Sequence, residues 1–158
     1  GFPRSIDRHY KSELTVPNGG GWGSWGQRDM CPAGTYAAGF SLKGFSALFL
    51  MIHHSSDHIF SSWGQWTDIK WCPSGFLTAF QLRVERSQGD GDDTAANNIM
   101  FQCTQGTLQG DGTNWGDWGS WSPTCGGKGI CGLKTRIELP QGRGDDTALN
   151  DVTMFCCD

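Results

Sequence analysis

The sequence lacks a long apolar run, an excess of positive charge and a glycosylation sequon. Its longest mainly apolar stretch, residues 45–52, is far shorter than the roughly 20 residues that a membrane-spanning helix requires. The formal net charge is −4, which gives no electrostatic basis for binding nucleic acid or an anionic membrane surface. No Asn-x-Ser/Thr triplet occurs, so N-glycosylation is not expected. We therefore expect no membrane span and no nucleic-acid partner.

The sequence also lacks the third copy of a motif that it contains twice. Residues 88–97 and 141–150 both read Gln-Gly-x-Gly-Asp-Asp-Thr-Ala-x-Asn. A second motif, Trp-Gly-x-Trp, occurs once in each unit, at 22–25, 63–66 and 115–118, and the last copy overlaps a further one at 118–121. Self-similarity at a nearly fixed spacing is typical of repeat architectures. The sequence therefore predicts three copies of one unit, the first of which is damaged.

Cysteine spacing supports the same units. Two cysteine pairs share a separation of 31 residues at equivalent places in the repeats, which indicates one disulfide in each unit. The third repeat carries an additional pair that most simply forms its own bridge, although other pairings among the four C-terminal cysteines are open. We predict the disulfides Cys72–Cys103, Cys125–Cys156 and Cys131–Cys157.

One cysteine lacks an expected counterpart. Cys31 begins the first unit in the same Cys-Pro-x-Gly context as Cys72, and its partner should lie near position 62, where Ser62 stands. We therefore expect Cys31 to remain a thiol that could link chains to one another. A disulfide framework implies an oxidising compartment. We expect an extracellular, secreted protein whose signal peptide is not present in this chain.

Alternation of apolar and polar residues predicts antiparallel strands. Phe80, Leu82 and Val84 alternate with polar residues, and residues 133–139 repeat that pattern. Twenty-four glycines make long helices improbable. Three sheets with one apolar face each can bury those faces against one another in a three-sided prism with a pseudo-threefold axis. A β-sandwich or a trefoil barrel would satisfy the same alternation.

Together, these motifs and the terminal Cys156-Cys157 pair resemble the vitelline membrane outer layer protein 1 family. The resemblance covers residues 12–43 and 61–158. It implies an all-β, β-prism I fold of three Greek-key antiparallel sheets. It also implies a secreted structural protein of the outer egg coat or of epithelial secretions. The implied partners are glycans or glycoproteins of an extracellular coat, bound or weakly processed as chito-oligosaccharides.

The departure from this family lies in residues 44–60, where an apolar, histidine-bearing stretch replaces the expected motif. We therefore expect a single domain, 1–158, with repeats at about 12–60, 61–111 and 112–158. The first sheet is expected to be incomplete, and residues 44–60 to be the least ordered part of the chain.

Acidic side chains are the candidates for catalysis, because glycoside chemistry needs two carboxyl groups on either side of the scissile bond. Adjacent aspartates followed by Thr and Asn also serve tight turns, by accepting hydrogen bonds from their own backbone. We favour this structural interpretation and assign no catalytic residue. An enzyme of this kind would be a glycosyltransferase or transglycosylase acting on N-acetylchito-oligosaccharides. The candidates are Asp92, Asp93, Asp145, Asp146, Glu85 and Glu138.

Tryptophans are the candidates for stacking on sugar rings, although aromatic side chains also dominate sheet packing. Trp-x-x-Trp is in addition the acceptor pattern for tryptophan C-mannosylation. No cofactor or metal is expected, and the histidines at 53, 54 and 58 lie in the aberrant stretch. The candidates for glycan stacking are Trp22, Trp25, Trp63, Trp66, Trp115, Trp118 and Trp121.

Overall fold

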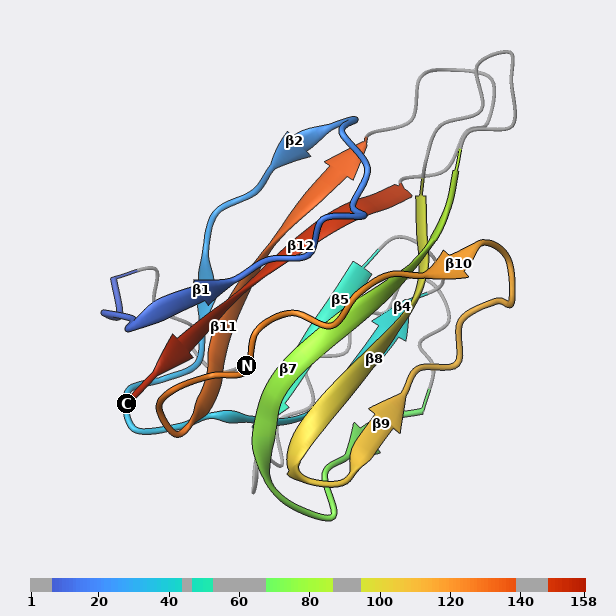
Figure 1. Cartoon of the computed structure of the whole chain (residues 1–158). Helices are drawn as coiled ribbons and strands as arrows, with labels where there is room; N and C mark the ends of the chain where they lie inside the picture. Colours follow the sequence, from blue (N-terminus) through green and yellow to red (C-terminus); the bar gives the residue numbers. More distant parts are fainter. Residues whose placement is uncertain (1–6, 44–46, 53–67, 87–94, 139–147) are drawn as a thin grey trace.

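The computed structural model describes residues 7–43, 47–52, 68–86, 95–138 and 148–158 (Figure 1). In this part of the chain, twelve strands form three antiparallel sheets, and there is no helix. No helix long and apolar enough to cross a membrane is therefore found in it. The three sheets surround one core, which confirms the predicted all-β prism.

The second sheet is built on a long hairpin of β7 (Ser74–Glu85) and β8 (Ala95–Gln105). Strand β9 (Thr107–Gln109) pairs with β8, and β10 (Asp117–Trp118) pairs with β7. The alternation in β7 places Phe80 and its apolar neighbours on the core face. The order of the sheet is therefore β10-β7-β8-β9.

The third sheet repeats this order with strands from both ends of the chain. Its hairpin consists of β11 (Gly129–Glu138) and β12 (Ala148–Cys157). Strand β1 (Ser12–Leu14) pairs with β12, while β2 (Ser24–Trp25) and β3 (Asp29–Met30) pair with β11. The N-terminal segment therefore completes the sheet of the last repeat, and the sheets cross the boundaries of the sequence repeats.

Within the described residues, the first sheet has three strands, in the order β5-β4-β6, against four in the second sheet. It contains β4 (Ala37–Lys43), β5 (Ala47–Ile52) and β6 (Lys70–Trp71). Strand β5 comes from the stretch that departs from the repeat, yet it pairs with β4 and buries Leu48 and Leu50. Residues 47–52 therefore form a strand with a core face although they carry no repeat motif, and the expectation that 44–60 is the least ordered stretch stays a prediction. The remainder of 44–60 lies outside the described residues.

All three sheets contribute to the same core. The Phe101 ring of the second sheet lies 4.8 Å from the Phe40 ring of the first sheet and 6.4 Å from the Phe80 ring, measured between centroids. Met154 and Val152 of the third sheet are fully buried in the same cluster. Buried aromatic pairs contribute beyond the area they remove from water. The Phe101 ring therefore joins the first and second sheets.

Three disulfides tie strands together, and they are the pairs expected from the spacing. Their Cα atoms are 5.8, 5.6 and 5.7 Å apart, well within the range that a disulfide spans. Cys31 forms none of them and is only 1% exposed. The bridges are Cys72–Cys103, Cys125–Cys156 and Cys131–Cys157.

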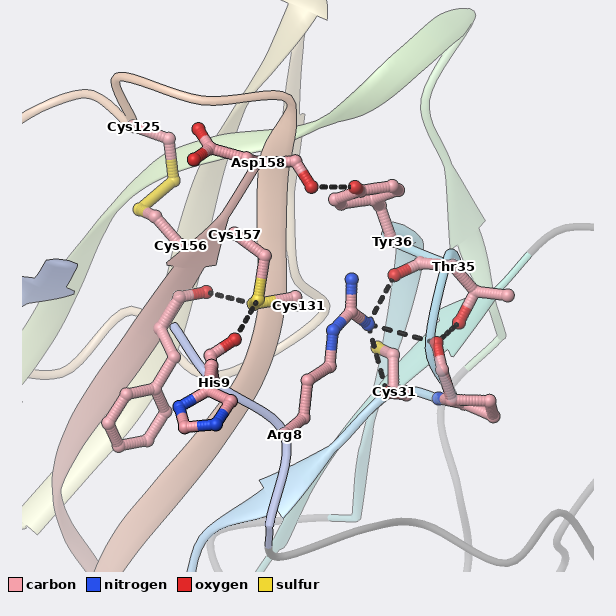
Figure 2. Close-up of a disulfide and its surroundings, with 12 residues drawn as sticks. Arg8, His9, Cys31, Thr35, Tyr36, Cys125, Cys131, Cys156, Cys157 and Asp158 are labelled. Carbon is pink, nitrogen blue, oxygen red and sulfur yellow. Dashed lines mark hydrogen bonds between the residues drawn. A yellow bond between two sulfur atoms is a disulfide. The ribbon is translucent and has the colours of Figure 1, made fainter. Parts of the chain in front are cut away.

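A clasp between distant segments closes the end of the molecule at which the chain terminates (Figure 2). The Arg8 guanidinium donates hydrogen bonds to the carbonyls of Cys31 and Pro32 at 2.9 Å and of Thr35 at 2.7 Å. It also lies 5.1 Å from the centroid of the Tyr36 ring. The Tyr36 hydroxyl donates to the backbone carbonyl of Asp158. The N-terminal segment is thereby fastened to the start of the first repeat and, through Tyr36, to the C-terminus.

Candidate functional site

Three of the four Trp-Gly-x-Trp motifs lie in the described residues, and the two at 22–25 and 115–118 form short edge strands. The motif at 22–25 contains β2 and pairs Trp25 with Arg136. The motif at 115–118 contains β10 and pairs Trp118 with Arg83. The two motifs therefore occupy equivalent positions in the third and second sheets. The motif at 63–66 lies outside the described residues.

A glycine and an arginine fix each motif. Gly23 and Gly116 have φ angles of 90° and 80°, a conformation that glycine adopts without steric cost. The Nε atom of Arg136 donates to the carbonyl of Gly23, and that of Arg83 to the carbonyl of Gly116, both at 3.2 Å. Neither arginine was predicted from the sequence. Both occupy equivalent positions in two repeats, and that repetition could have identified them.

The two tryptophans of each motif have different surroundings. The first ones, Trp22 and Trp115, are 57% and 66% exposed. The second ones each have a cation near the ring: Lys134 Nζ is 5.2 Å from the Trp25 centroid, and the Arg83 guanidinium is 5.8 Å from the Trp118 centroid. Cation–π contacts of this kind favour a fixed ring position. The first tryptophan of each motif therefore projects, and the second is held against the sheet.

Trp121 is held in a third way. When the Gln81 amide is oriented to satisfy its surroundings, its oxygen accepts a hydrogen bond from Trp121 Nε1 at 2.9 Å. Its nitrogen then donates to the Gly119 carbonyl at 3.0 Å. Trp121 is 40% exposed, so one side of its ring remains open to solvent.

Hydrogen bonds and an ion pair cross two of the seams between sheets. Asn18, between β1 and β2, donates from Nδ2 to the Leu82 carbonyl at 3.0 Å and so joins the third sheet to the second. Asp111, which follows β9, pairs with Lys70 of β6 at 3.1 Å and joins the second sheet to the first. Lys70 and Asp111 are both partly exposed, so their pairing contributes little stability.

The seam between the first and third sheets contains a pocket of about 260 Å³. Apolar side chains of β5 and β11 form much of its wall, together with Gln27, which precedes β3, and Asp29 of β3. Lys134 lines the pocket, and its Nζ atom lies 5.2 Å from the centroid of the Trp25 ring, which is not itself part of the lining. The lining residues are Gln27, Asp29, Ala47, Leu48, Phe49, Leu133, Lys134, Thr135 and Ile137.

This pocket combines an apolar wall with an amide, a carboxylate, a hydroxyl and an ammonium group. Such a combination suits a small polar ligand that also has an apolar face. The sequence analysis did not predict the pocket, because its walls come from strands that are about 80 positions apart in the chain.

The structure leaves most of the acidic candidates untested. Asp92, Asp93, Asp145 and Asp146 lie outside the described residues. Glu85 and Glu138 are the last residues of β7 and β11, and therefore hold equivalent positions. No group of three or more His, Cys, Asp or Glu residues that could hold a metal occurs in the described part of the chain. The histidines at 53, 54 and 58 lie outside it.

The asparagine that ends each Asp-Asp-Thr-Ala-x-Asn motif lies at a β-bulge. The register of each hairpin shifts at this point, so Asn97 and Asn150 are the extra residues of β8 and β12. Their backbone carbonyls accept hydrogen bonds from the amides of Thr113 at 3.1 Å and Gly20 at 2.7 Å. Each bulge therefore anchors the segment that leads into the neighbouring Trp-Gly-x-Trp motif.

The next residue after each bulge differs between the repeats: Asn98 in the second sheet and Asp151 in the third. Burial raises the pKa of Asp151, while a hydrogen bond from the Val152 amide and the charge of Arg136 lower it by less. Gly19 lies so close to the Asp151 carboxyl that an added Cβ would overlap it. Asp151 is thus a partly desolvated carboxyl that the sequence analysis missed.

Comparisons with known proteins agree with this architecture. The chain is 43% identical to the mouse vitelline membrane outer layer protein 1 homolog over 174 residues, which covers 96% of this chain and 86% of the mouse protein. It is 44% identical to the human homolog over 170 residues, covering 94% of this chain and 84% of the human protein. The family model for vitelline membrane outer layer protein I matches residues 51–158, beginning within β5. The chain therefore belongs to the vitelline membrane outer layer protein I family.

Proposed function

We propose that this protein is a secreted structural component of an extracellular coat, such as the vitelline membrane outer layer or an epithelial secretion, and that it binds glycans. Family membership supports the coat role. Three disulfides fit an oxidising, extracellular environment. The partners are glycans or glycoproteins of that coat.

The observation that carries the glycan proposal is the pocket between β5 and β11. A sugar ring presents one apolar face of C–H groups and a rim of hydroxyls. The apolar residues Leu48, Leu133 and Ile137 in the pocket wall provide a surface for the apolar face. Gln27, Asp29 and Thr135 provide hydrogen-bonding groups for the hydroxyls. The volume, about 260 Å³, is slightly below the usual range of ligand sites and suits one or two sugar residues.

Two polar residues of the pocket test this site. Gln27 and Thr135 line the pocket, whereas Trp118 lies at the edge of the second sheet. A glycan array on the wild-type protein would identify a ligand, and titration calorimetry would compare the Q27A/T135V double variant with W118A. We expect Q27A/T135V to lose binding at least tenfold and W118A to retain it. Equal binding by Q27A/T135V and the wild type would place the glycan elsewhere.

The same material tests for turnover. Oligosaccharide ligands from the array would be incubated with the protein and followed by mass spectrometry. For a coat protein that only binds, we expect the ligand to be recovered without new chain lengths. New products that disappear in the D92A/D145A double variant, at unchanged stability, would favour an enzyme instead.

A further inference from the structure

The two most exposed large hydrophobic residues in the described part of the chain are Trp115 and Trp22, at 66% and 57%. Large exposed indoles are unusual, because burial of an aromatic side chain contributes substantially to folding. Both residues are the first tryptophan of a Trp-Gly-x-Trp motif, and they come from different repeats. The indoles are exposed at equivalent positions of two repeats, so their exposure is a property of the motif.

The backbone of the motif explains the exposure. Pairing with the hairpin begins only at the third residue, so that Ser24 lies opposite Ile137 and Asp117 opposite Val84. The first tryptophan therefore precedes the edge strand, and a glycine with positive φ separates it from that strand. Its side chain has no position within the sheet, and both copies project into solvent.

The arginine of the neighbouring strand holds this part of the chain in place. Arg83 donates from Nη2 to the Asn114 carbonyl at 2.8 Å and from Nε to the Trp115 carbonyl at 3.2 Å. These bonds hold the main chain on either side of the Trp115 amide and do not involve the indole. The side chain can therefore carry a bulky substituent without disturbing the sheet.

From this arrangement we infer that Trp22 and Trp115 are C-mannosylated. The first tryptophan of Trp-x-x-Trp is the acceptor for transferases of the secretory pathway, so the inference rests on the secretion included in the proposed function. A polyprenyl phosphate-linked mannose supplies the sugar. The bond between its anomeric carbon and the phosphate oxygen breaks, a bond forms from that carbon to indole C2, and the C2 proton leaves to a base. Nothing is oxidised or reduced.

The structure gives this modification a physical role. An attached mannose adds hydroxyls to an indole that the fold leaves in water. It thereby reduces the exposed apolar surface of two matched sites, and exposed apolar patches promote association. It also lies beside an edge strand, and polar bulk at an edge hinders pairing with another chain. The proposal covers Trp22 and Trp115, since the motif at 63–66 lies outside the described residues and Trp118, which begins the motif at 118–121, lies against the Arg83 guanidinium.

The test compares two hosts. The full chain, carrying a secretory leader, is produced in mammalian cells and in derived cells that lack tryptophan C-mannosyltransferases. Peptides containing Trp22 and Trp115 are then analysed by tandem mass spectrometry from both medium and lysate. We expect fragmentation of peptides from the competent cells to place one hexose on Trp22 and one on Trp115, each with cleavage across the sugar ring. Trp118, the first residue of the motif at 118–121, lies in the same peptide as Trp115, so the fragments and not the peptide mass assign the site. Peptides from the deficient cells should be unmodified.

Three variants test the dependence on the motif. We expect W25A to abolish the hexose on Trp22 and to leave Trp115 modified, and W118A to abolish the hexose on Trp115 and to leave Trp22 modified. W121A alters only the overlapping motif at 118–121 and should leave both Trp22 and Trp115 modified. Because attachment precedes folding, the lysate peptides are informative even for a variant that does not fold. Unmodified Trp22 and Trp115 in competent cells, alongside a modified reference protein, would overturn the inference.

The outcome is separable from that of the proposed function. Glycan binding is measured on protein from the deficient cells, whose tryptophans carry no sugar. Loss of the modification therefore leaves the binding result intact. Absence of binding, in turn, leaves the peptide masses unchanged.

Discussion

Asn98 and Asp151 hold the same place after a β-bulge in two equivalent sheets, and each side-chain oxygen accepts a hydrogen bond from the next backbone amide at 2.8 Å. Each also lies opposite an arginine, Arg83 or Arg136. The geometry is shared, but one side chain is neutral and the other ionisable. Only Asp151 makes this structural position sensitive to pH.

Replacement of Asp151 by Asn should stabilise the protein at neutral pH. Burial raises the pKa of Asp151 above its usual 3.8, so the folded protein has its full stability below pH 3.8, where this carboxyl is protonated. The free energy of unfolding falls as the pH rises through the folded-state pKa of Asp151, because the carboxylate becomes charged while buried. The D151N variant avoids this fall in stability, because Asn keeps the hydrogen bond and carries no charge. Urea unfolding should show no gain below about pH 3.8 and a gain at pH 7.

The reciprocal variant, N98D, is the control. It places a carboxyl at the equivalent position of the second sheet, where Asn98 is 4% exposed. We expect N98D to lower the free energy of unfolding at neutral pH and to have a smaller effect in acid. A pH-independent effect of both substitutions would show that charge burial is not the cause.

Replacement of Gly116 by Ala should strongly destabilise the second sheet. Its positive φ costs a residue with a Cβ about 1–2 kcal/mol, and the added atom would also overlap the Val84 carbonyl. We expect a total loss on the order of 3 kcal/mol in chemical denaturation. Gly34 is the matched control, since its φ is 80° but nothing lies within 4 Å of an added Cβ. G34A should therefore cost about 1–2 kcal/mol, and equal losses would exclude the overlap as a cause.

Removal of the Arg8 side chain should loosen the clasp. R8A deletes three charge-assisted hydrogen bonds to the carbonyls of residues 31, 32 and 35, so we expect a loss of about 2 kcal/mol. Hydrogen exchange should rise in residues 7–11 and 31–36. H9A is the neighbouring control, because the His9 side chain is exposed. Equal free energies of unfolding for R8A and H9A would show that the clasp does not contribute to stability.

The thiol of Cys31 should react only after the fold opens. The side chain is 1% exposed, which argues against crosslinking through it in the folded chain. A maleimide reagent should label the native protein slowly and the unfolded, unreduced protein with one equivalent. Rapid labelling in native buffer would show that the region around Cys31 opens readily.

Local patterns in the sequence determined the strands, the cysteine pairing and the family. Alternation such as Phe80, Leu82 and Val84 predicts one buried face whatever lies against it, because the side-chain period of a strand is two. Equal cysteine spacing reports equal hairpin geometry in two repeats. The interpretation of the Asp-Asp-Thr-Ala-x-Asn motif as turn chemistry stays a prediction, since its aspartates lie outside the described residues, and its last residue lies at a bulge. These features depend on neighbours within one hairpin.

The tertiary structure alone decided how the hairpins combine. Residues 12–30 resemble the start of the first repeat, yet they pair with the last one, since an edge strand joins whichever sheet has an open edge beside it. Residues 47–52 carry no motif, yet Leu48 and Leu50 occupy the core, because the other two sheets leave an apolar surface to be covered. The pocket between β5 and β11 and the raised pKa of Asp151 depend on segments brought together from distant parts of the chain. Burial and proximity of this kind are properties of the assembled prism, and the order of residues does not encode them locally.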